Sequence, residues 1–182
     1  MSSIRPATAA DVPGMAAVHS ASAAKAYSNI FPDSAPAPTA SELIPSWDEL
    51  TAEPTSEVFV STAGEQVIGV VALRTESQTA RSGATGSLFL ARLYVHPDHW
   101  GSGRGSALHD RAVTAGFKRT DLLYLWVLED NSKARRMYER RGWQLIDGEI
   151  LINEPHSVRD VLYKLTSEAR NFRSLTRGSA AE

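Results

Sequence analysis

The sequence predicts a single mixed α/β domain, and three observations carry this prediction. Its 182 residues are about the length of one domain. Hydrophobic residues make up 42% of the chain and charged residues 22%, which is typical of globular proteins. Apolar runs of strand length alternate with segments of helical spacing, in the order βααβββαβαββ. That order does not fit an all-parallel doubly wound sheet, in which a helix separates successive strands.

The N-terminal third is predicted to hold a short strand and two helices. A strand over 3–6 is followed by a capping box that begins at Thr8, so a helix is expected from there toward Tyr27. Three prolines between 31 and 39 indicate a loop. A second helix is expected over 41–50.

Strand signals dominate the middle of the chain. Two β-rich runs, 57–61 and 67–73, surround a turn and predict a hairpin. A polar loop over 75–86 leads to a nearly all-apolar run, 88–95, which is expected to be a central strand.

Helices and strands alternate again toward the C-terminus. A glycine-rich turn over 101–105 precedes a helix that is expected to end near Gly116. The apolar run 122–128 predicts a strand, and apolar residues at helical spacing predict a helix over 131–141. Gly142 is expected to end that helix.

Two strands, over 143–152 and 157–165, close the predicted domain, which spans residues 1–166. Residues 167–182 contain few apolar side chains and are expected to form a flexible C-terminal tail.

Composition and charge exclude several classes of function. Lys and Arg number 19 and Asp and Glu 21, so the net charge is −2, which argues against nucleic-acid binding. There is no cysteine, so disulfides, thiolate zinc sites and cysteine nucleophiles are excluded. The first residues contain no apolar segment of a signal peptide, and the run 122–128 is far shorter than the ~20 residues of a membrane span. We therefore expect a cytoplasmic protein that binds no membrane.

The most informative segment joins an apolar strand to a helix through Gly101, Gly103 and Gly105. Glycines let backbone amides approach an anion, and the amides at a helix start carry partial positive charge. The segment therefore predicts a main-chain cradle for a phosphate group. Ser106 stands where a dinucleotide-binding fingerprint needs its last glycine, and no Walker-type lysine follows.

Two motifs resemble those of the GNAT superfamily of acyl-CoA-dependent N-acyltransferases. The residues from Trp100 to Gly105 are similar to its [QR]-x-x-G-x-[GA] motif, with Trp100 in place of Gln or Arg. The residues from Asn131 to Trp143 are similar to its N-x-x-A-x-x-x-Y-E-x-x-G-[FW] motif. The resemblance covers about residues 3–165. It implies a three-layer domain with a central mixed, mostly antiparallel sheet and helices on both faces.

The resemblance implies direct transfer of the acetyl group of acetyl-CoA, a co-substrate, to a primary amine of a small molecule or peptide. Amides of the glycine turn would hold the diphosphate, and the preceding strand would pair with the pantetheine arm. Since no cysteine is present, transfer within a ternary complex is expected. The cofactor-binding residues implied in this way are Leu93, Tyr94, Val95, Gly101, Ser102, Gly103, Arg104, Gly105, Ser106 and Asn131.

The resemblance also implies that Tyr138 is catalytic. A phenol is protonated at neutral pH and can donate to the leaving thiolate. A packing tyrosine on the inner face of its helix is the alternative. Asn131 has two alternative roles: it contacts the pantetheine arm, or it caps the N-terminus of the helix. No general base is assigned, because Trp126 occupies the position where some family members carry Glu.

The acceptor is expected between the N-terminal helices, as far as Trp47, and a late loop over 153–156. Tyr27, Phe31 and Trp126 are the candidate contacts with it.

No metal is expected. His96, Asp98 and His99 are interpreted as turn residues around Pro97. Homodimers are frequent in the family, so the resemblance leaves a homodimer as an option.

Two other classes of function stay open at this point. One is a non-catalytic acyl-CoA-binding or sensing module. It is favoured by the absence of a recognisable general base and by Trp100, which replaces the Gln or Arg of the family motif. A nucleotide-binding protein unrelated to coenzyme A is the other alternative.

Overall fold

The computed structural model describes residues 2–76, 86–154 and 156–169. Their strands form one seven-stranded sheet in the order β1-β2-β3-β4-β5-β7-β6. The strands are β1 (Ser2–Pro6), β2 (Glu57–Ala63), β3 (Gln66–Glu76), β4 (Ser87–Val95), β5 (Leu122–Leu128), β6 (Gln144–Asn153) and β7 (Val158–Thr166). The α-helices are α1 (Val12–Ala26), α2 (Ala40–Ala52), α3 (Arg104–Gly116) and α4 (Ser132–Glu139), and short 3-10 turns are η1 (Ala9–Asp11) and η2 (Pro97–His99). Among these strands only β4 and β5 pair in parallel, which confirms the predicted mixed, mostly antiparallel sheet.

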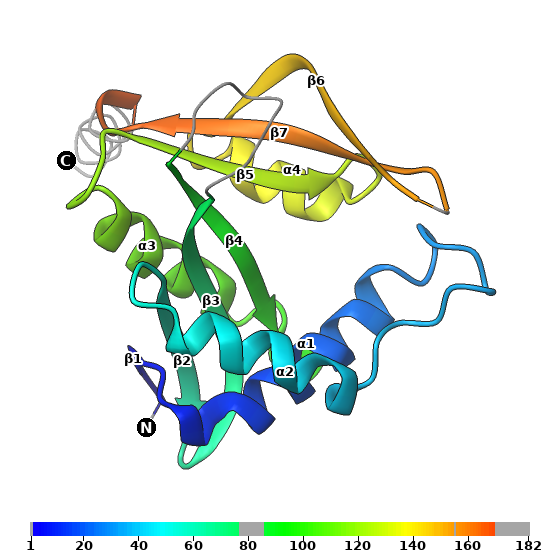
Figure 1. Ribbon diagram of the computed structural model, residues 1–182, viewed down its shortest axis with the longest axis vertical. Helices are drawn as coiled ribbons and strands as arrows, with labels where there is room; N and C mark the ends of the chain where they lie inside the picture. Colours follow the sequence, from blue (N-terminus) through cyan, green and yellow to red (C-terminus); the bar gives the residue numbers. More distant parts are fainter. Residues whose placement is uncertain (1, 77–85, 155, 170–182) are drawn as a thin grey trace, which may run out of the picture.

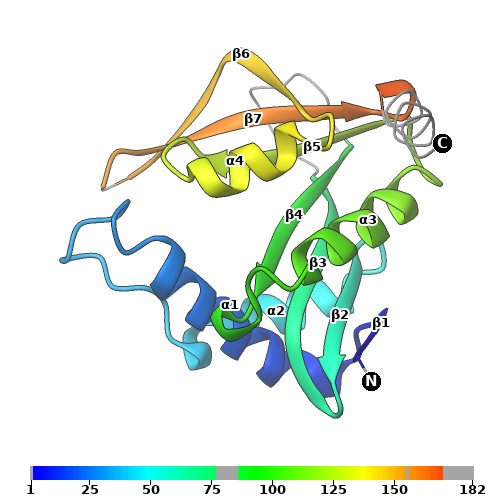
Figure 2. The same ribbon diagram turned by 180° about the vertical axis from the view of Figure 1, so that it is seen from behind.

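The helices lie on both faces of the sheet (Figure 1, Figure 2). α1 and α2 cover one face, where Trp47 and Val70 belong to one buried cluster. α3 and α4 cover the other, where Leu108 and Tyr138 belong to a second cluster. Side chains alternate along a strand, so Val71 joins the second cluster while its neighbour joins the first. The three layers implied by the resemblance are therefore present.

The order of strands and helices is the predicted one, and the differences lie at element ends. The turn predicted over 101–105 is too long, because α3 already begins at Arg104. Its N-cap is Gly103, whose φ of 80° is a left-handed backbone that glycine adopts without strain. The helix predicted over 131–141 is shorter and ends at Glu139.

Two predicted segments lie largely outside the described residues. Of the loop over 75–86, the first two residues belong to β3, and 77–85 are not described. Of the tail over 167–182, only the first three residues are described, and they form a helical turn. None of the described helices has the length and apolar character that a bilayer span requires.

β4 and β5 are neighbours that separate along their length. Their register holds only where Leu88 faces Leu123 and Phe89 faces Tyr124. Beyond these pairs, β4 stays paired with β3 and β5 stays paired with β7. Figure 1 shows the two strands diverging from their shared end, so the sheet opens into a V.

A β-bulge at Ala91 interrupts the pairing of β4 with β3. Leu73 faces Leu90 while Ala72 faces Arg92, which leaves Ala91 as the extra residue.

The extra residue reverses the alternation of faces in the second half of β4. Leu90 belongs to the cluster beneath α3, and after the bulge Leu93 and Val95 join the same cluster. Arg92 and Tyr94 consequently face the α1 and α2 layer. There the Arg92 guanidinium lies 4.5 Å from the centre of a tryptophan ring of α2, and Tyr94 stacks on a histidine of α1.

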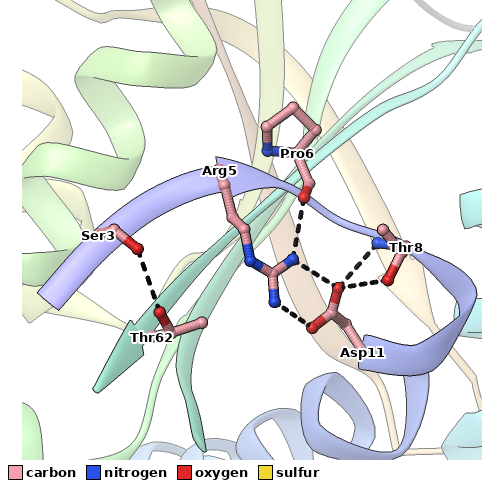
Figure 3. Close-up of polar contacts among 6 residues, drawn as sticks. All are labelled: Ser3, Arg5, Pro6, Thr8, Asp11 and Thr62. Atoms are coloured by element: carbon pink, nitrogen blue, oxygen red, sulfur yellow. Dashed lines mark hydrogen bonds and ion pairs between the residues drawn. The ribbon is translucent and has the colours of Figure 1, made fainter. Parts of the chain in front are cut away.

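An ion pair ties β1 to the start of α1 (Figure 3). Nη1 and Nη2 of Arg5 each donate to a carboxylate oxygen of Asp11 at 2.8 Å. The amide and hydroxyl of Thr8 donate to the same carboxylate, so the predicted capping box is formed. Nearby, the hydroxyl oxygens of Ser3 and Thr62 lie 3.3 Å apart and join β1 to β2.

This network predicts a pH-dependent contribution to stability. The hydrogen bond from Arg5, reinforced by Thr8, lowers the pKa of Asp11 to about 2. A carboxyl with a depressed folded pKa stabilises the protein above its unfolded pKa and loses that contribution as the pH falls through the folded value. We expect Asp11→Asn to lower the free energy of unfolding by about 1–2 kcal/mol at neutral pH, since Arg5 is partly exposed.

Urea unfolding of both proteins as a function of pH measures this effect. The difference between them should shrink between about pH 4 and pH 2. A difference that is equally large at both ends of this interval would contradict the assignment.

Candidate functional site

A cavity of about 940 Å³ opens where β4 and β5 part. Its wall is built from the end of α1 and the following loop, the diverging ends of β4 and β5, and parts of α4 and β7. Its size is that of a small-molecule site. The lining residues that matter most for its chemistry are Tyr27, Arg92, Tyr94, Trp126, Tyr138 and Asp160.

The glycine turn lies between the end of β4 and the start of α3. Gly101 and Gly103 have left-handed φ values of 78° and 80°, which a side chain would strain. The amide of Ala107 donates to the carbonyl of Gly103, so the amides before it are those that a helix start leaves without an intrahelical partner. Such amides are what the predicted anion site requires, and none of the turn residues 101–106 lines the cavity itself.

Gly105 shows that the turn has room for a ligand. A Cβ built at this position would meet only Val95 Cγ2, at an ordinary contact distance of 3.6 Å. The protein around Gly105 therefore leaves space for a methyl group beside the turn. This space and the amides of the helix start are features that a bound diphosphate would need.

Trp100, which departs from the family motif, holds the turn in place. Its indole N–H donates to the carbonyl of Val95 at 2.7 Å. The ammonium of Lys133 lies 4.3 Å from the centre of the indole ring, so a cation of α4 stands beside the turn. Arg104, the first residue of α3, adds a second positive side chain at the same end.

Tyr138 lies on α4, is 7% exposed and lines the cavity. Its ring centre lies 6.2 Å from that of His109 and 5.9 Å from that of Trp143. The indole N–H of Trp143 donates to Nε2 of His109 at 2.8 Å. This hydrogen bond fixes the two aromatic rings that pack against Tyr138. Burial raises the pKa of Tyr138, which keeps its hydroxyl protonated at neutral pH.

Asn131 is the N-cap of α4 and also lines the cavity. Its Oδ1 accepts a hydrogen bond from the amide of Ala134 at 3.1 Å. Further along the helix, Nε of Arg135 donates to the hydroxyl of Tyr163 at 3.0 Å, and that hydroxyl donates to Glu139 at 2.6 Å. These bonds tie α4, and with it Tyr138, to β7.

The three candidate acceptor contacts lie along the same cavity. Tyr27 and Phe31 follow α1 with ring centres 6.1 Å apart, and His156 of the late loop meets Phe31 edge-on at 6.2 Å. Trp126 is half-buried and lines the β5 side. The acceptor region was expected to extend as far as Trp47. This expectation is wrong, because Trp47 is fully buried in the core beneath α2.

Two phenols and a carboxylate line the cavity and act on one another electrostatically. Burial is the main cause that raises the pKa of Tyr27 and of Tyr94, and each hydroxyl also affects the pKa of the other. The negative charge of Asp160 on β7 raises both pKa values further. Asp160, Tyr27 and Tyr94 thus share the wall of one cavity.

His19 and Arg92 belong to this wall, although sequence reasoning did not identify them. The ring of His19 stacks on Tyr94 with centres 3.9 Å apart. Burial, with the charge of Arg92 as the second cause, lowers the pKa of His19 to about 4, so the ring is neutral at pH 7. Asp160 was missed as well, and its one sequence signal was an acidic residue directly before the apolar run 161–163.

The segment around Pro97 has turn geometry. Nδ1 of His96 accepts a hydrogen bond from the amide of Asp98 at 3.4 Å at the start of η2. Within the described ranges, no three His, Asp or Glu side chains gather as metal ligands.

A family model decides where this chain belongs. The model of the acetyltransferase (GNAT) family matches residues 23–143, well over half of the chain. The chain belongs to the GNAT acetyltransferase family. A comparison with curated proteins gives no match.

Several solved acetyltransferases share the fold of this GNAT protein. An acetyltransferase from Thermus thermophilus has 19% identity over 91% of this chain and 97% of its own, with a TM-score of 0.66. The PaiA N-acetyltransferase from Thermoplasma acidophilum, solved with coenzyme A, has 18% identity over 91% and 99%, with a TM-score of 0.63. A GCN5-related N-acetyltransferase from Rhodopseudomonas palustris has 16% identity over 90% and 94%, with a TM-score of 0.70.

The environment of His19 in this GNAT protein predicts a loss of stability in mild acid. Because its folded pKa of about 4 lies below the unfolded value, the unfolded chain binds more protons between the two. Stability should therefore fall as the pH drops from about 6.5 toward 4. NMR titration of the imidazole should show a midpoint near pH 4, and His19→Gln should flatten the fall in Tm. An imidazole midpoint above about pH 6 would contradict the buried placement.

Proposed function

We propose that this protein is an N-acetyltransferase that moves the acetyl group of acetyl-CoA directly to a primary amine of a small molecule or peptide. The observation that carries the proposal is the parting of β4 and β5, with an anion-binding turn at its mouth and Tyr138 in its wall. Family membership supports acyl transfer. The coenzyme A bound to the T. acidophilum relative supports the choice of acyl donor.

The glycine turn would hold the diphosphate of coenzyme A. Its main-chain amides point an array of partial positive charges at the ligand, and Lys133 and Arg104 add full charges beside them. The pantetheine arm is rich in amides and would pair with the inner edge of β4 from Leu93 to Val95, where β5 no longer lies alongside.

The reaction forms a C–N bond and breaks a C–S bond. The amine lone pair attacks the thioester carbon, the amine releases a proton, and the departing thiolate takes one up. Tyr138 is the proposed donor to the thiolate, because it lines the cavity and its hydroxyl is protonated at neutral pH. Its phenolate then regains a proton from solvent.

The proton of the amine has no acceptor on the two central strands. On the described parts of β4 and β5 no carboxylate lines the cavity, and Glu129 beyond β5 is paired with Arg159 at 3.3 Å. Asp33 and Asp160 line the cavity from the loop after α1 and from β7, and we propose that water in the open cavity carries the proton from the amine to these carboxylates or to solvent.

Release of free thiol tests the proposed function. The protein is incubated with acetyl-CoA and a panel of primary amines, and the thiol of coenzyme A is followed over time. We expect release that depends on the amine. Coenzyme A binding without release across the whole panel would contradict the proposal and favour the sensing module.

Tyr138→Phe should lower turnover at least tenfold, which corresponds to about 1.4 kcal/mol of lost transition-state stabilisation. The substitution removes the donor O–H but keeps the ring that packs on Trp143. Affinity for acetyl-CoA, measured by calorimetry, should hardly change. Tyr124→Phe is the matched control, since Tyr124 stacks on Phe89 outside the cavity wall. Unchanged turnover in Tyr138→Phe would remove this residue from the mechanism.

Gly105→Ala should weaken coenzyme A binding without harming the fold. The new methyl group meets only an ordinary contact with Val95 but occupies the space beside the turn. Alanine is also a better helix residue than glycine by about 0.5–1 kcal/mol, so Tm should stay or rise. Gly64→Ala is the opposite control, because its φ of 61° predicts lower stability with unchanged binding. Full coenzyme A affinity in Gly105→Ala would place the diphosphate elsewhere.

A further inference from the structure

Arg92 is a half-buried cation of the cavity wall that forms no ion pair with the described residues. Its guanidinium stacks on Trp47 and donates one hydrogen bond, to Oγ of Ser46 at 3.3 Å. No carboxylate of the described ranges lies within ion-pair distance of it. A guanidinium presents five N–H donors in a planar fork, so these contacts use a minority of its capacity.

The neighbouring Arg74 on β3 shows the contrast. Arg74 pairs with Glu53 at 3.3 Å and with Glu49 at 4.0 Å. Glu49 and Glu53 are thus within ion-pair distance of a different arginine. Burial is the main cause that lowers the pKa of Arg92 and the positive Arg74 lowers it further, while Tyr94 and the charge of Glu49 raise it. An anion bound at Arg92 would relieve both effects.

The far side of the cavity carries the opposite charge. Asp160 on β7 acts on the hydroxyl groups of Tyr27 and Tyr94, while Arg92 acts on Tyr94 from the β4 side. The wall therefore has a cation on β4 and carboxylates on β7 and in the loop after α1, Asp160 and Asp33, and the phenols Tyr27 and Tyr94 line it as well. The neutral ring of His19 adds aromatic surface and no competing charge.

We propose that the acceptor is an aminocarboxylate, whose carboxylate binds the Arg92 guanidinium and whose amine lies on the side of Asp160. This inference rests on the proposed function and names the substrate class of its acceptor site. A guanidinium matches a carboxylate with two parallel N–H···O bonds, which fixes orientation as well as position. A substrate held by its carboxylate on β4 has its amine confined to the space between the parted strands, where the thioester would lie.

Ligand-observed NMR with saturating coenzyme A tests this binding independently of turnover. The probes are the amino acids of proteins, β-alanine and 4-aminobutyrate, each compared with its own carboxamide. The carboxamide keeps the amine and the size of the probe but lacks the negative charge. We expect at least one aminocarboxylate to bind at least tenfold more tightly than its carboxamide. If none binds more tightly than its carboxamide, the inference is overturned.

Three variants test whether Arg92 is the recognising group. Arg92→Met keeps an unbranched stem over Trp47 and should bring the ratio of the two affinities close to one. Arg92→Lys keeps the charge without the fork and should give an intermediate ratio. Arg74→Gln removes an equal charge outside the cavity wall and should leave the ratio unchanged. An undiminished ratio in Arg92→Met, or an equal loss in Arg74→Gln, would refute the assignment.

The thiol-release assay separates this inference from the proposed function. Acetylation of amines with no preference for a carboxylate would overturn the inference and leave the N-acetyltransferase in place. Absence of release with every amine would overturn the proposed function, and the affinity ratio would still decide the role of Arg92. Weaker coenzyme A binding in Arg92→Met would assign the guanidinium to the donor and count against the inference.

Discussion

The separation of β4 from β5 after two residue pairs is the constraint on which the site depends. Backbone N–H and C=O groups along the facing edges lose a strand partner at that point. Such groups are costly when they are buried without one. A ligand arm made of amides supplies the missing partners, so the shape of the sheet favours a pantetheine-like chain. The same separation opens the cavity into which Tyr138 and the acceptor wall project.

β4 and β5 are each stabilised by other elements on the side where they part. β4 pairs with β3 and packs against the helices α1 and α2, while β5 pairs with β7. Near the glycine turn, the contact of Lys133 with Trp100 joins the two sides of the V. The two strands can therefore stay apart without a bound ligand, which agrees with a preformed site.

The bulge at Ala91 gives one strand two chemical roles. On one face, Leu93 and Val95 complete the core beneath α3, as their apolar character requires. On the other, Arg92 and Tyr94 become part of the acceptor wall. A regular strand would have turned these two polar side chains toward the core beneath α3 instead. The one extra residue thus directs apolar side chains into the core and polar side chains into the cavity from the same strand.

The parts of the fold that could be predicted are those with local signals. The capping box at Thr8 and the hairpin of β2 and β3 are each determined by a few adjacent residues. The end of α4 was predicted less well, since the helix ends at Glu139, before Gly142. The glycine turn and Tyr138 belong to compact motifs and could be selected in the same way. α3 was placed too late, because glycine is a poor helix residue while Gly103 serves as a left-handed N-cap.

The acceptor wall could not be predicted, because it depends on contacts between distant segments. A nearly all-apolar run such as 88–95 carries no mark of the register shift with β3 that places Arg92. His19 lies on a helix whose residues are mostly small, and its stacking on Tyr94 exists only after α1 packs on the sheet. Asp160 reaches the cavity because β7 pairs with β5.

A crystal structure of the protein with coenzyme A would locate the acyl donor in the cavity. We expect the diphosphate on the amides between Gly103 and Ala107, the pantetheine arm between β4 and β5, and the sulfur within hydrogen-bond distance of the Tyr138 hydroxyl. A diphosphate bound away from the glycine turn, or a sulfur outside the cavity, would contradict this expectation.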